Sequence, residues 1–174
     1  MTTESPFQLE LHAVDQRALD PATALEFVSD PGFGGITMFV GRVRNANHGR
    51  DVTGVSYSLF APLVLKVFER ACREAAEEIG PHLRLHVSHA HGRLGIGDLA
   101  VVVAAGTPHR DEAFRACRKV IEIVKHESPI WKKEHYSGGD SEWSEGCSLC
   151  VREAEPMTAE LKPHVHGPDC GHEH

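Results

Sequence analysis

Positively charged side chains at three places in the sequence are the first candidates for chemistry. His109 and Arg110 follow Thr107-Pro108, between an apolar run and a helical pattern. The first N–H groups of a helix are unpaired and carry partial positive charge, and these two side chains add donors beside them. This combination suits a phosphate or carboxylate. An ordinary surface helix start with an incidental arginine is the plainer alternative.

A second group of charges lies around Pro129. Lys125 ends a helical pattern, the proline turns the chain, and Lys132, Lys133 and Glu134 follow. Ammonium groups held close together disfavour each other's charge, so a lysine here can act as a nucleophile or a proton donor near neutral pH. The structural alternatives are a lysine that complements the helix dipole and a solvated Lys-Lys-Glu run.

The third group is Arg42 and Arg44, at the end of an expected strand. Alternation along a strand predicts that both side chains share one face. Two neighbouring guanidinium groups repel each other unless an anion lies between them, although charges that protect an edge strand are an equally good explanation. Each of the three groups lies at the end of a regular element, where side chains can converge. Together they predict a pocket for a compact anionic ligand.

Composition sets the frame for this pocket. The 174 residues are 41% hydrophobic and 25% charged, which is typical of one globular domain. A net charge of −7 excludes a general nucleic-acid-binding surface. No apolar run approaches the roughly 20 residues that a membrane helix needs. The N-terminus lacks the pattern of a signal peptide, so a cytoplasmic location is expected.

The expected elements follow the order strand, helix, strand, strand, helix, strand, strand and helix, so that strands come in adjacent pairs. A short helix runs from Asp20-Pro21 to Val28, and two longer amphipathic helices follow Pro62 and Thr107-Pro108. Strands are expected over 35–43, 52–60, 83–87 and 99–105, with the last one central because it is almost continuously apolar. The polar stretch between the first two strands predicts a long hairpin, and Trp131 is expected to anchor the segment after Pro129. This order predicts an α+β fold with a mostly antiparallel sheet and helices packed on one side. No glycine-rich phosphate loop is present.

Composition also divides the chain into a folded body, 1–150, and a tail, 151–174. The tail is acidic, rich in histidine and proline, and expected to be mostly extended. A Cys-x-x-Cys pair ends the body, and further cysteine and histidine residues follow in the tail. These side chains are good zinc ligands, but their spacing leaves three interpretations open: weak or adventitious metal binding, a structural zinc site, or an unstructured extension. The metal-ligand candidates are Cys147, Cys150, His164, His166, Cys170, His172 and His174. Cys72 and Cys117 lie on apolar helix faces and are expected to be buried.

Several of these segments resemble the large, catalytic subunit of molybdopterin synthase. The matching stretches are Gly35-Ile-Thr-Met-Phe-Val-Gly-Arg-Val-Arg-Asn45, His89 to Leu94, Pro108-His-Arg110, and Lys125 through Pro129-Ile-Trp-Lys-Lys-Glu134. Their order and spacing agree throughout, and the resemblance covers roughly residues 7–145. The Pro-Ile-Trp-Lys-Lys-Glu block, together with the upstream lysine and the His-Arg pair, is its most specific part.

The resemblance implies an α/β hammerhead-type fold and a homodimer of large subunits, each of which binds a small ubiquitin-like sulfur carrier. The carrier's C-terminal Gly-Gly, as a thiocarboxylate, would donate sulfur to cyclic pyranopterin monophosphate. Two such transfers produce the dithiolene of molybdopterin. The assembly would then be a heterotetramer, with no metal or cofactor required for the reaction.

The resemblance also assigns roles to the three charged groups. Lys125 would bind substrate and act as an acid–base residue, and Lys132 would act as a nucleophile or an acid–base group. Glu134 would orient a lysine. The remaining substrate-binding candidates are Arg42, Arg44, His109, Arg110 and Lys133. One departure is Ala90, where family members usually carry an arginine after the histidine that matches His89.

Two other functions remain open at this point. The chain could deliver metal ions through its Cys/His tail, or it could be an inactive module that only binds ubiquitin-like tails. Deletion of 151–174 would separate metal delivery from sulfur transfer, because the enzyme should keep its activity. The retained lysines and the His-Arg pair argue against an inactive module, which has no need of a substrate cradle.

Overall fold

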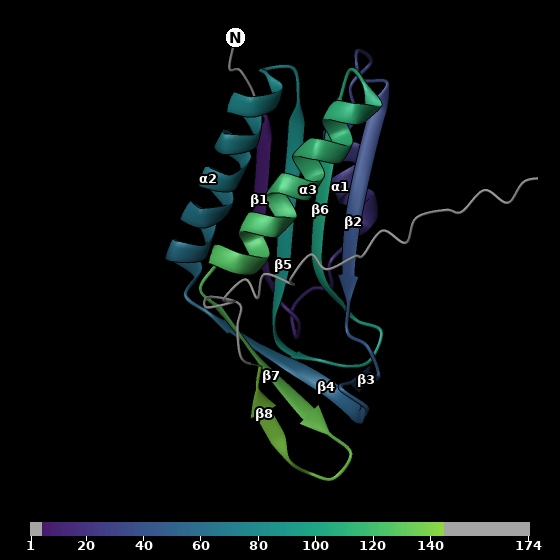
Figure 1. The fold of residues 1–174 in the computed structure, drawn as a ribbon, viewed down its shortest axis with the longest axis vertical. Coiled ribbons are helices and arrows are strands. Elements are labelled where there is room, and N and C mark those ends of the chain that lie inside the picture. The colour runs from purple at the N-terminus through teal and green to yellow at the C-terminus, as the bar shows by residue number, and fades with distance from the viewer. Residues whose placement is uncertain (1–4, 145–174) are drawn as a thin grey trace, which may run out of the picture.

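The computed structural model describes residues 5–144 (Figure 1). Its elements in chain order are β1 (Phe7–Ala13), α1 (Pro21–Val28), β2 (Gly35–Arg42), β3 (Ala46–Asn47), β4 (Arg50–Leu59), α2 (Ala61–Ile79), β5 (Arg84–Leu94), β6 (Leu99–Thr107), α3 (Arg110–Glu127), β7 (Ile130–Tyr136) and β8 (Ser141–Trp143). Within this range the strands form one sheet in the order β2-β6-β5-β4-β7-β8, with β1 beside β5 and β3 beside β4. The β1–β5 pair is parallel and the other pairs are antiparallel, which confirms the α+β class.

The two long helices lie side by side on one face of the sheet (Figure 1). Apolar residues at helical spacing turn one stripe of each helix inward, and Phe68 and Cys72 of α2 and Val120 of α3 are buried there. In α3, Asp111 lies in the first turn and Lys125 in the last, so both charges favour the helix dipole. Burial of this stripe fixes where each end of α3 lies.

The short helix α1 covers the opposite face. Alternation along β6 turns Val103 toward the long helices and Val102 toward α1. Gly106 allows the close approach of α1, because a Cβ at this position would lie 2.0 Å from the Val28 carbonyl oxygen. Asp20 caps α1 by accepting a hydrogen bond from the Ala22 N–H, at 2.9 Å. The predicted one-sided packing therefore describes α2 and α3, while α1 completes a second layer.

Strand β5 joins two parts of the sheet. Along one edge it pairs first with β1, as far as His91 opposite Ala13, and then with β4, from Gly92 opposite Tyr57. Gly92 has φ +99 at the change of partner, a left-handed conformation that glycine adopts without a Cβ penalty. Strands β4, β7 and β8 thus form a separate group at the end of the sheet nearest the C-terminal end of α3 (Figure 1).

Two predictions about these elements are wrong. Strands β2 and β4 do not form a hairpin: β2 pairs with β6, whereas β4 pairs with β5 and β7. The intervening segment instead holds β3, which forms its own small hairpin with β4. Trp131 is 50% exposed and does not anchor the chain after Pro129, because the neighbouring Ile130 takes the buried side of β7 at 7% exposure.

Other predictions hold or lie outside the described residues. Cys72 and Cys117 are buried as expected, and β6 is an interior strand of the sheet. The tail, 151–174, and the candidate metal ligands from Cys147 onward lie outside residues 5–144, as does the proposed domain boundary at residue 150. In the part of the chain that the structure describes, no helix is long and apolar enough to cross a membrane.

Candidate active site

A cavity of about 620 Å³ opens where the last turn of α3 meets the strands of both parts of the sheet. Its volume falls within the usual range for small-molecule sites. Its walls come from segments far apart in the sequence, between Phe39 and Lys132. The lining residues are Phe39, Val40, Gly41, Arg42, Arg44, Tyr57, His89, Ala100, Val101, Val124, Lys125, Ile130 and Lys132.

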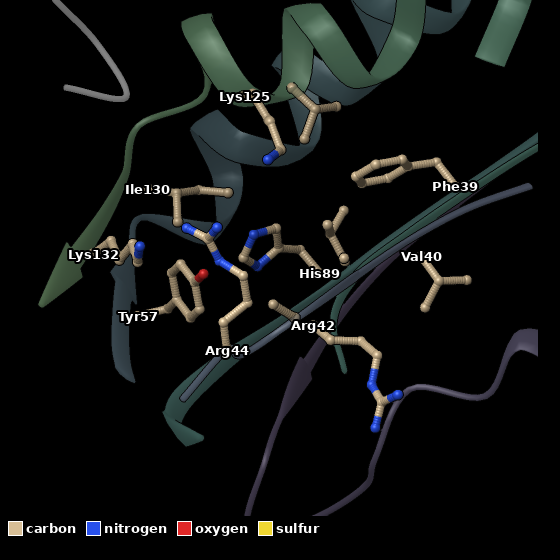
Figure 2. A pocket seen from close by; sticks show the side chains of 13 residues that line it. Phe39, Val40, Arg42, Arg44, Tyr57, His89, Lys125, Ile130 and Lys132 are labelled. Atoms are coloured by element: carbon tan, nitrogen blue, oxygen red, sulfur yellow. The ribbon is translucent and has the colours of Figure 1, made fainter. Parts of the chain in front are cut away.

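Cationic side chains converge on this cavity. Figure 2 shows Arg44, Lys125 and Lys132 around its centre; they come from the loop after β2, from α3 and from β7. Arg42 also lines the wall, but its Nε donates to the Gly97 carbonyl at 3.0 Å and its guanidinium group points away from Arg44. No aspartate or glutamate is among the residues that line the cavity. A concave site with several cations and no lining carboxylate favours an anionic ligand.

The charges of Arg44 and Lys125 are available to such a ligand. Within residues 5–144 neither side chain has a carboxylate partner. The Lys125 ammonium group lies 5.6 Å from the centroid of the Phe39 ring, within the range of a cation–π contact. The aromatic ring thus keeps Lys125 over the cavity without neutralising its charge.

Alternation along β7 separates the two neighbouring lysines. Lys132 lines the cavity, whereas the Lys133 side chain lies on the other face of the strand, 5.6 Å from the centroid of the Trp143 ring. The structure therefore does not bring Lys133 into this site. The sequence named both lysines because a Pro-Ile-Trp-Lys-Lys-Glu run was not assigned to a strand, and without a strand the two faces cannot be distinguished.

Glu134 lies two residues beyond Lys132 on the same face of β7, and its carboxylate is buried. Oε1 accepts a hydrogen bond from the Lys132 ammonium group at 2.5 Å. Oε2 accepts from Asn47 Nδ2 at 2.6 Å and from the Tyr136 hydroxyl at 2.8 Å. Burial raises the pKa of the Glu134 carboxyl, and these hydrogen bonds outweigh burial, so its pKa lies below the ordinary value. Glu134 therefore remains ionised and stabilises the positive charge of Lys132.

His89 projects into the middle of the cavity (Figure 2). Burial lowers its pKa to about 4, and its Nδ1 pairs with the Ala90 carbonyl oxygen at 2.7 Å. Only a protonated nitrogen can donate to a carbonyl, so Nδ1 carries the proton and Nε2 is the acceptor. The ring also packs against Tyr57 in a T-shaped arrangement, with centroids 5.0 Å apart. His89 thus adds a neutral hydrogen-bond acceptor to a site otherwise rich in donors.

No role for His89 or Tyr57 was predicted from the sequence. The alternation over 52–60 included Tyr57 without separating it from its apolar neighbours, and His89 lay beyond the strand expected over 83–87. Asn47 lay in an expected loop and carried no signal at all. By contrast, Ala90 lies on the sheet face that packs against α1, opposite the cavity. The arginine usual at that position would therefore not line this cavity.

The His109–Arg110 pair lies at the other end of α3 from Lys125. At 1.5 Å per residue the helix places Arg110 about 22 Å from Lys125 along its axis. Neither residue of the pair lines the cavity. The His109 carbonyl accepts a hydrogen bond from the Thr107 hydroxyl at 2.7 Å, which shapes the start of the helix. A single copy of the chain thus brings two of the three cationic groups together, but not the third.

Comparison with known proteins identifies the family. The sequence profile of the MoaE protein family matches residues 14–127, more than half of the chain. The chain belongs to the MoaE family. The molybdopterin synthase catalytic subunit of Synechococcus elongatus is 47% identical over 129 residues, which cover 74% of this chain and 78% of that relative. Molybdopterin synthase catalytic subunit 1 of Mycobacterium tuberculosis is 47% identical over 122 residues, 68% of this chain and 80% of the relative.

Solved structures show the same fold. Molybdopterin synthase from Staphylococcus aureus superposes with a TM-score of 0.72 at 28% identity, covering 82% of this chain and 99% of that one. A protein–protein complex of subunits 1 and 2 of the molybdopterin-converting factor from Helicobacter pylori gives a TM-score of 0.62 at 24% identity, covering 81% and 91%. The resemblance inferred from the sequence is confirmed. The chain is a sulfurtransferase of molybdenum cofactor biosynthesis, like its MoaE relatives.

Proposed function

We propose that this sulfur transfer runs from the thiocarboxylated C-terminus of a small ubiquitin-like carrier to cyclic pyranopterin monophosphate, inside the cavity lined by Lys125 and Lys132. The observation that carries the proposal is the charge of this cavity: cations line it and no carboxylate does. Both reactants are anions, one a cyclic phosphate and the other a thiocarboxylate. The site therefore suits both, and its positive charge would also attract the carrier's C-terminal tail.

Lys132 acts in this proposal as an acid–base group and not as a nucleophile. A nucleophilic amine needs a free lone pair, whereas the Lys132 nitrogen is engaged in an ion pair with the Glu134 carboxylate at 2.5 Å. An ammonium group beside the reacting atoms can stabilise developing negative charge and donate a proton to a leaving oxygen. Lys125 and Arg44 bind the phosphate in this proposal, because they lack carboxylate partners within residues 5–144.

The active assembly in our proposal is a heterotetramer of two large and two small subunits. The Helicobacter pylori structure of the same fold is a complex of two different subunits, which supports a small-subunit partner here. Strand β2 lies at the end of the sheet, and its Ile36 and Val40 side chains are exposed, which supports a contact between two copies of this chain. A second copy could then bring its own His109 and Arg110 to the cavity that a single copy leaves incomplete.

We propose no resident metal or cofactor for the transfer itself. Within residues 5–144, no group of three or more His, Cys, Asp or Glu side chains is placed to hold a metal ion. Zinc or another divalent metal at the tail is a separate question, since its candidate ligands lie outside this range. A cytoplasmic location likewise stays part of the proposal.

A reconstituted assay tests the proposed reaction. The full chain is mixed with thiocarboxylated carrier and cyclic pyranopterin monophosphate, and molybdopterin is measured. We expect product from the native chain, and a large loss of product with Lys132→Ala and with Lys125→Ala. Lys133→Ala is the matched comparison, because it removes the same charge from the other face of β7 and should keep most of the activity. Equal loss from all three variants would show that general positive charge, and not this cavity, carries the function.

A further inference from the structure

The two oxygens of the Glu134 carboxylate have different partners: Oε2 accepts hydrogen bonds from two fixed donors, and Oε1 accepts one from Lys132. Its residue is only 3% exposed, and Oε2 accepts two hydrogen bonds, from Asn47 at 2.6 Å and from Tyr136 at 2.8 Å. Donors of this kind offset the cost of burying a charged carboxylate, and charge-assisted hydrogen bonds are short and strong. Two donors on one oxygen also fix the plane of the carboxylate. The direction of Oε1, which contacts Lys132 at 2.5 Å, follows from that plane.

The two donors are themselves fixed by neighbouring hairpins. The Tyr136 ring is buried, and the Arg50 guanidinium carbon lies 3.6 Å from its centroid. Arg50 in turn forms ion pairs with Asp140 and Glu142, which come from the turn before β8 and from β8 itself. Asn47 is paired with Arg50 in the small β3–β4 hairpin. Both donors therefore belong to hairpins that Arg50 links beside the site.

Neither donor lines the cavity that holds Lys125, so neither is placed to touch a reactant there. Both line a second hollow of about 600 Å³ next to Glu134, and Asn47 also borders a hollow of about 40 Å³ beside Lys132, which is too small for a reactant. Their effect must pass through Glu134. A lysine side chain is long and flexible, and an acid–base group is effective only when its reactive atom is held close to the productive position. The hydrogen bond to Glu134 Oε1 supplies that restraint for Lys132.

We infer that Asn47 and Tyr136 are positioning residues, which fix the Glu134 carboxylate and thereby hold the Lys132 ammonium group at the wall of the cavity. The inference rests on the proposed function, in which Lys132 contacts the reactants. Both residues lie outside the charged motifs, one in a two-residue strand and one at the end of β7.

Tyr136→Phe and Asn47→Leu test the inference, because each removes a donor and keeps a side chain of similar size. In the reconstituted assay we expect kcat to fall about tenfold, as for the loss of a hydrogen bond to a charged group, while KM for the pterin changes less than about twofold. Ser56→Ala is the control, since it removes a 2.8 Å hydrogen bond to His135 between the same two strands, β4 and β7. It should leave kcat unchanged. Native kcat in both test variants would overturn the inference.

A double-mutant cycle separates positioning from general stability. In a Glu134→Gln background, Tyr136→Phe should cause little further loss of kcat, because the carboxylate through which Tyr136 acts is already absent. If the fold-losses of kcat from the two single variants multiply in the double variant, Tyr136 acts by another route and the inference is refuted.

A second measurement does not depend on activity. In chains labelled with ¹⁵N-lysine, NMR order parameters report how far each ammonium group is restrained. We expect the Lys132 value to fall toward that of the exposed Lys66 in Tyr136→Phe and Asn47→Leu, and to stay at the native level in Ser56→Ala. An unchanged value would refute positioning, whatever the activity. The two failures can be told apart. If the native chain makes no product but the variants still lower the Lys132 order parameter, the proposed reaction is refuted and the positioning role stands.

Discussion

A neutral buried histidine should make this fold sensitive to mild acid. Burial lowers the pKa of His89 to about 4 in the folded chain, from the ordinary value of 6.5. As the pH falls below about 6.5, the unfolded chain binds a proton at His89 that the folded chain accepts only near pH 4. Stability is therefore fully present above this window and is lost as the pH falls through it. A pKa difference of about 2.5 corresponds to about 3 kcal/mol in total, of which about 2 kcal/mol is lost between pH 7 and pH 5.

Urea unfolding at about pH 7 and pH 5 measures this loss in the native chain and in His89→Asn. Asparagine can still donate to the Ala90 carbonyl but does not titrate, so the variant should lose about 2 kcal/mol less than the native chain over this interval. The buried acidic groups titrate mainly below this range and are common to both chains. His82→Asn, at an exposed histidine, should show the native loss. Equal pH dependence in the native chain and His89→Asn would show that His89 is not held neutral, and the account of the cavity as a site with one neutral acceptor would fail.

Three other outcomes follow from the structure. If a second copy supplies the His109–Arg110 pair, Arg110→Ala and Lys125→Ala chains should each be inactive alone and regain activity when dissociated and reassembled together; no recovery would refute a shared site. Phe68→Ala should lower the free energy of unfolding by about 3–5 kcal/mol, because its fully buried ring leaves a cavity between α2 and the sheet, and a urea titration that shows a much smaller loss would contradict this packing. A chain that lacks 151–174 should form molybdopterin at the native rate in the reconstituted assay, whereas loss of product would revive a role for the Cys/His tail.

The three helices and strands β2, β4, β5 and β6 were predictable from the sequence because their signals are local, whereas the residue ranges of β1, β3, β7 and β8 were not predicted. The stripe that contains Phe68 and Cys72 repeats at helical spacing, and the buried strand over 99–105 is almost continuously apolar. Asp20 followed by proline marked the start of α1. Strand partners were not predictable, since the pairing of β2 with β6 joins segments more than fifty residues apart. A local sequence pattern does not specify which strand edge a given strand will pair with.

The residues predicted for the candidate site also fall into two groups, those that the structure places on the cavity and those that it does not. Lys125 and Lys132 were identified from residue type and from the family resemblance, and the structure places both on one cavity. Lys133 and the His109–Arg110 pair were predicted to bind substrate beside them, yet the structure places these three residues away from the cavity. Their position depends on which face of β7 turns inward and on the length of α3, and neither is visible in the spacing of charges.

The sequence by itself determined the kind of chemistry, which is the binding of an anionic ligand by cations. The chain has a net charge of −7, yet it concentrates cations at the ends of its elements, in the order typical of the MoaE family. What only the tertiary structure decided was which cations act together and what holds them. Glu134, Asn47 and Tyr136 meet because the β3–β4 hairpin and β7 pack side by side, and His89 becomes neutral because the sheet buries it. Charge type is a property of single residues, whereas burial, hydrogen bonding and convergence depend on contacts between segments that the fold alone brings together.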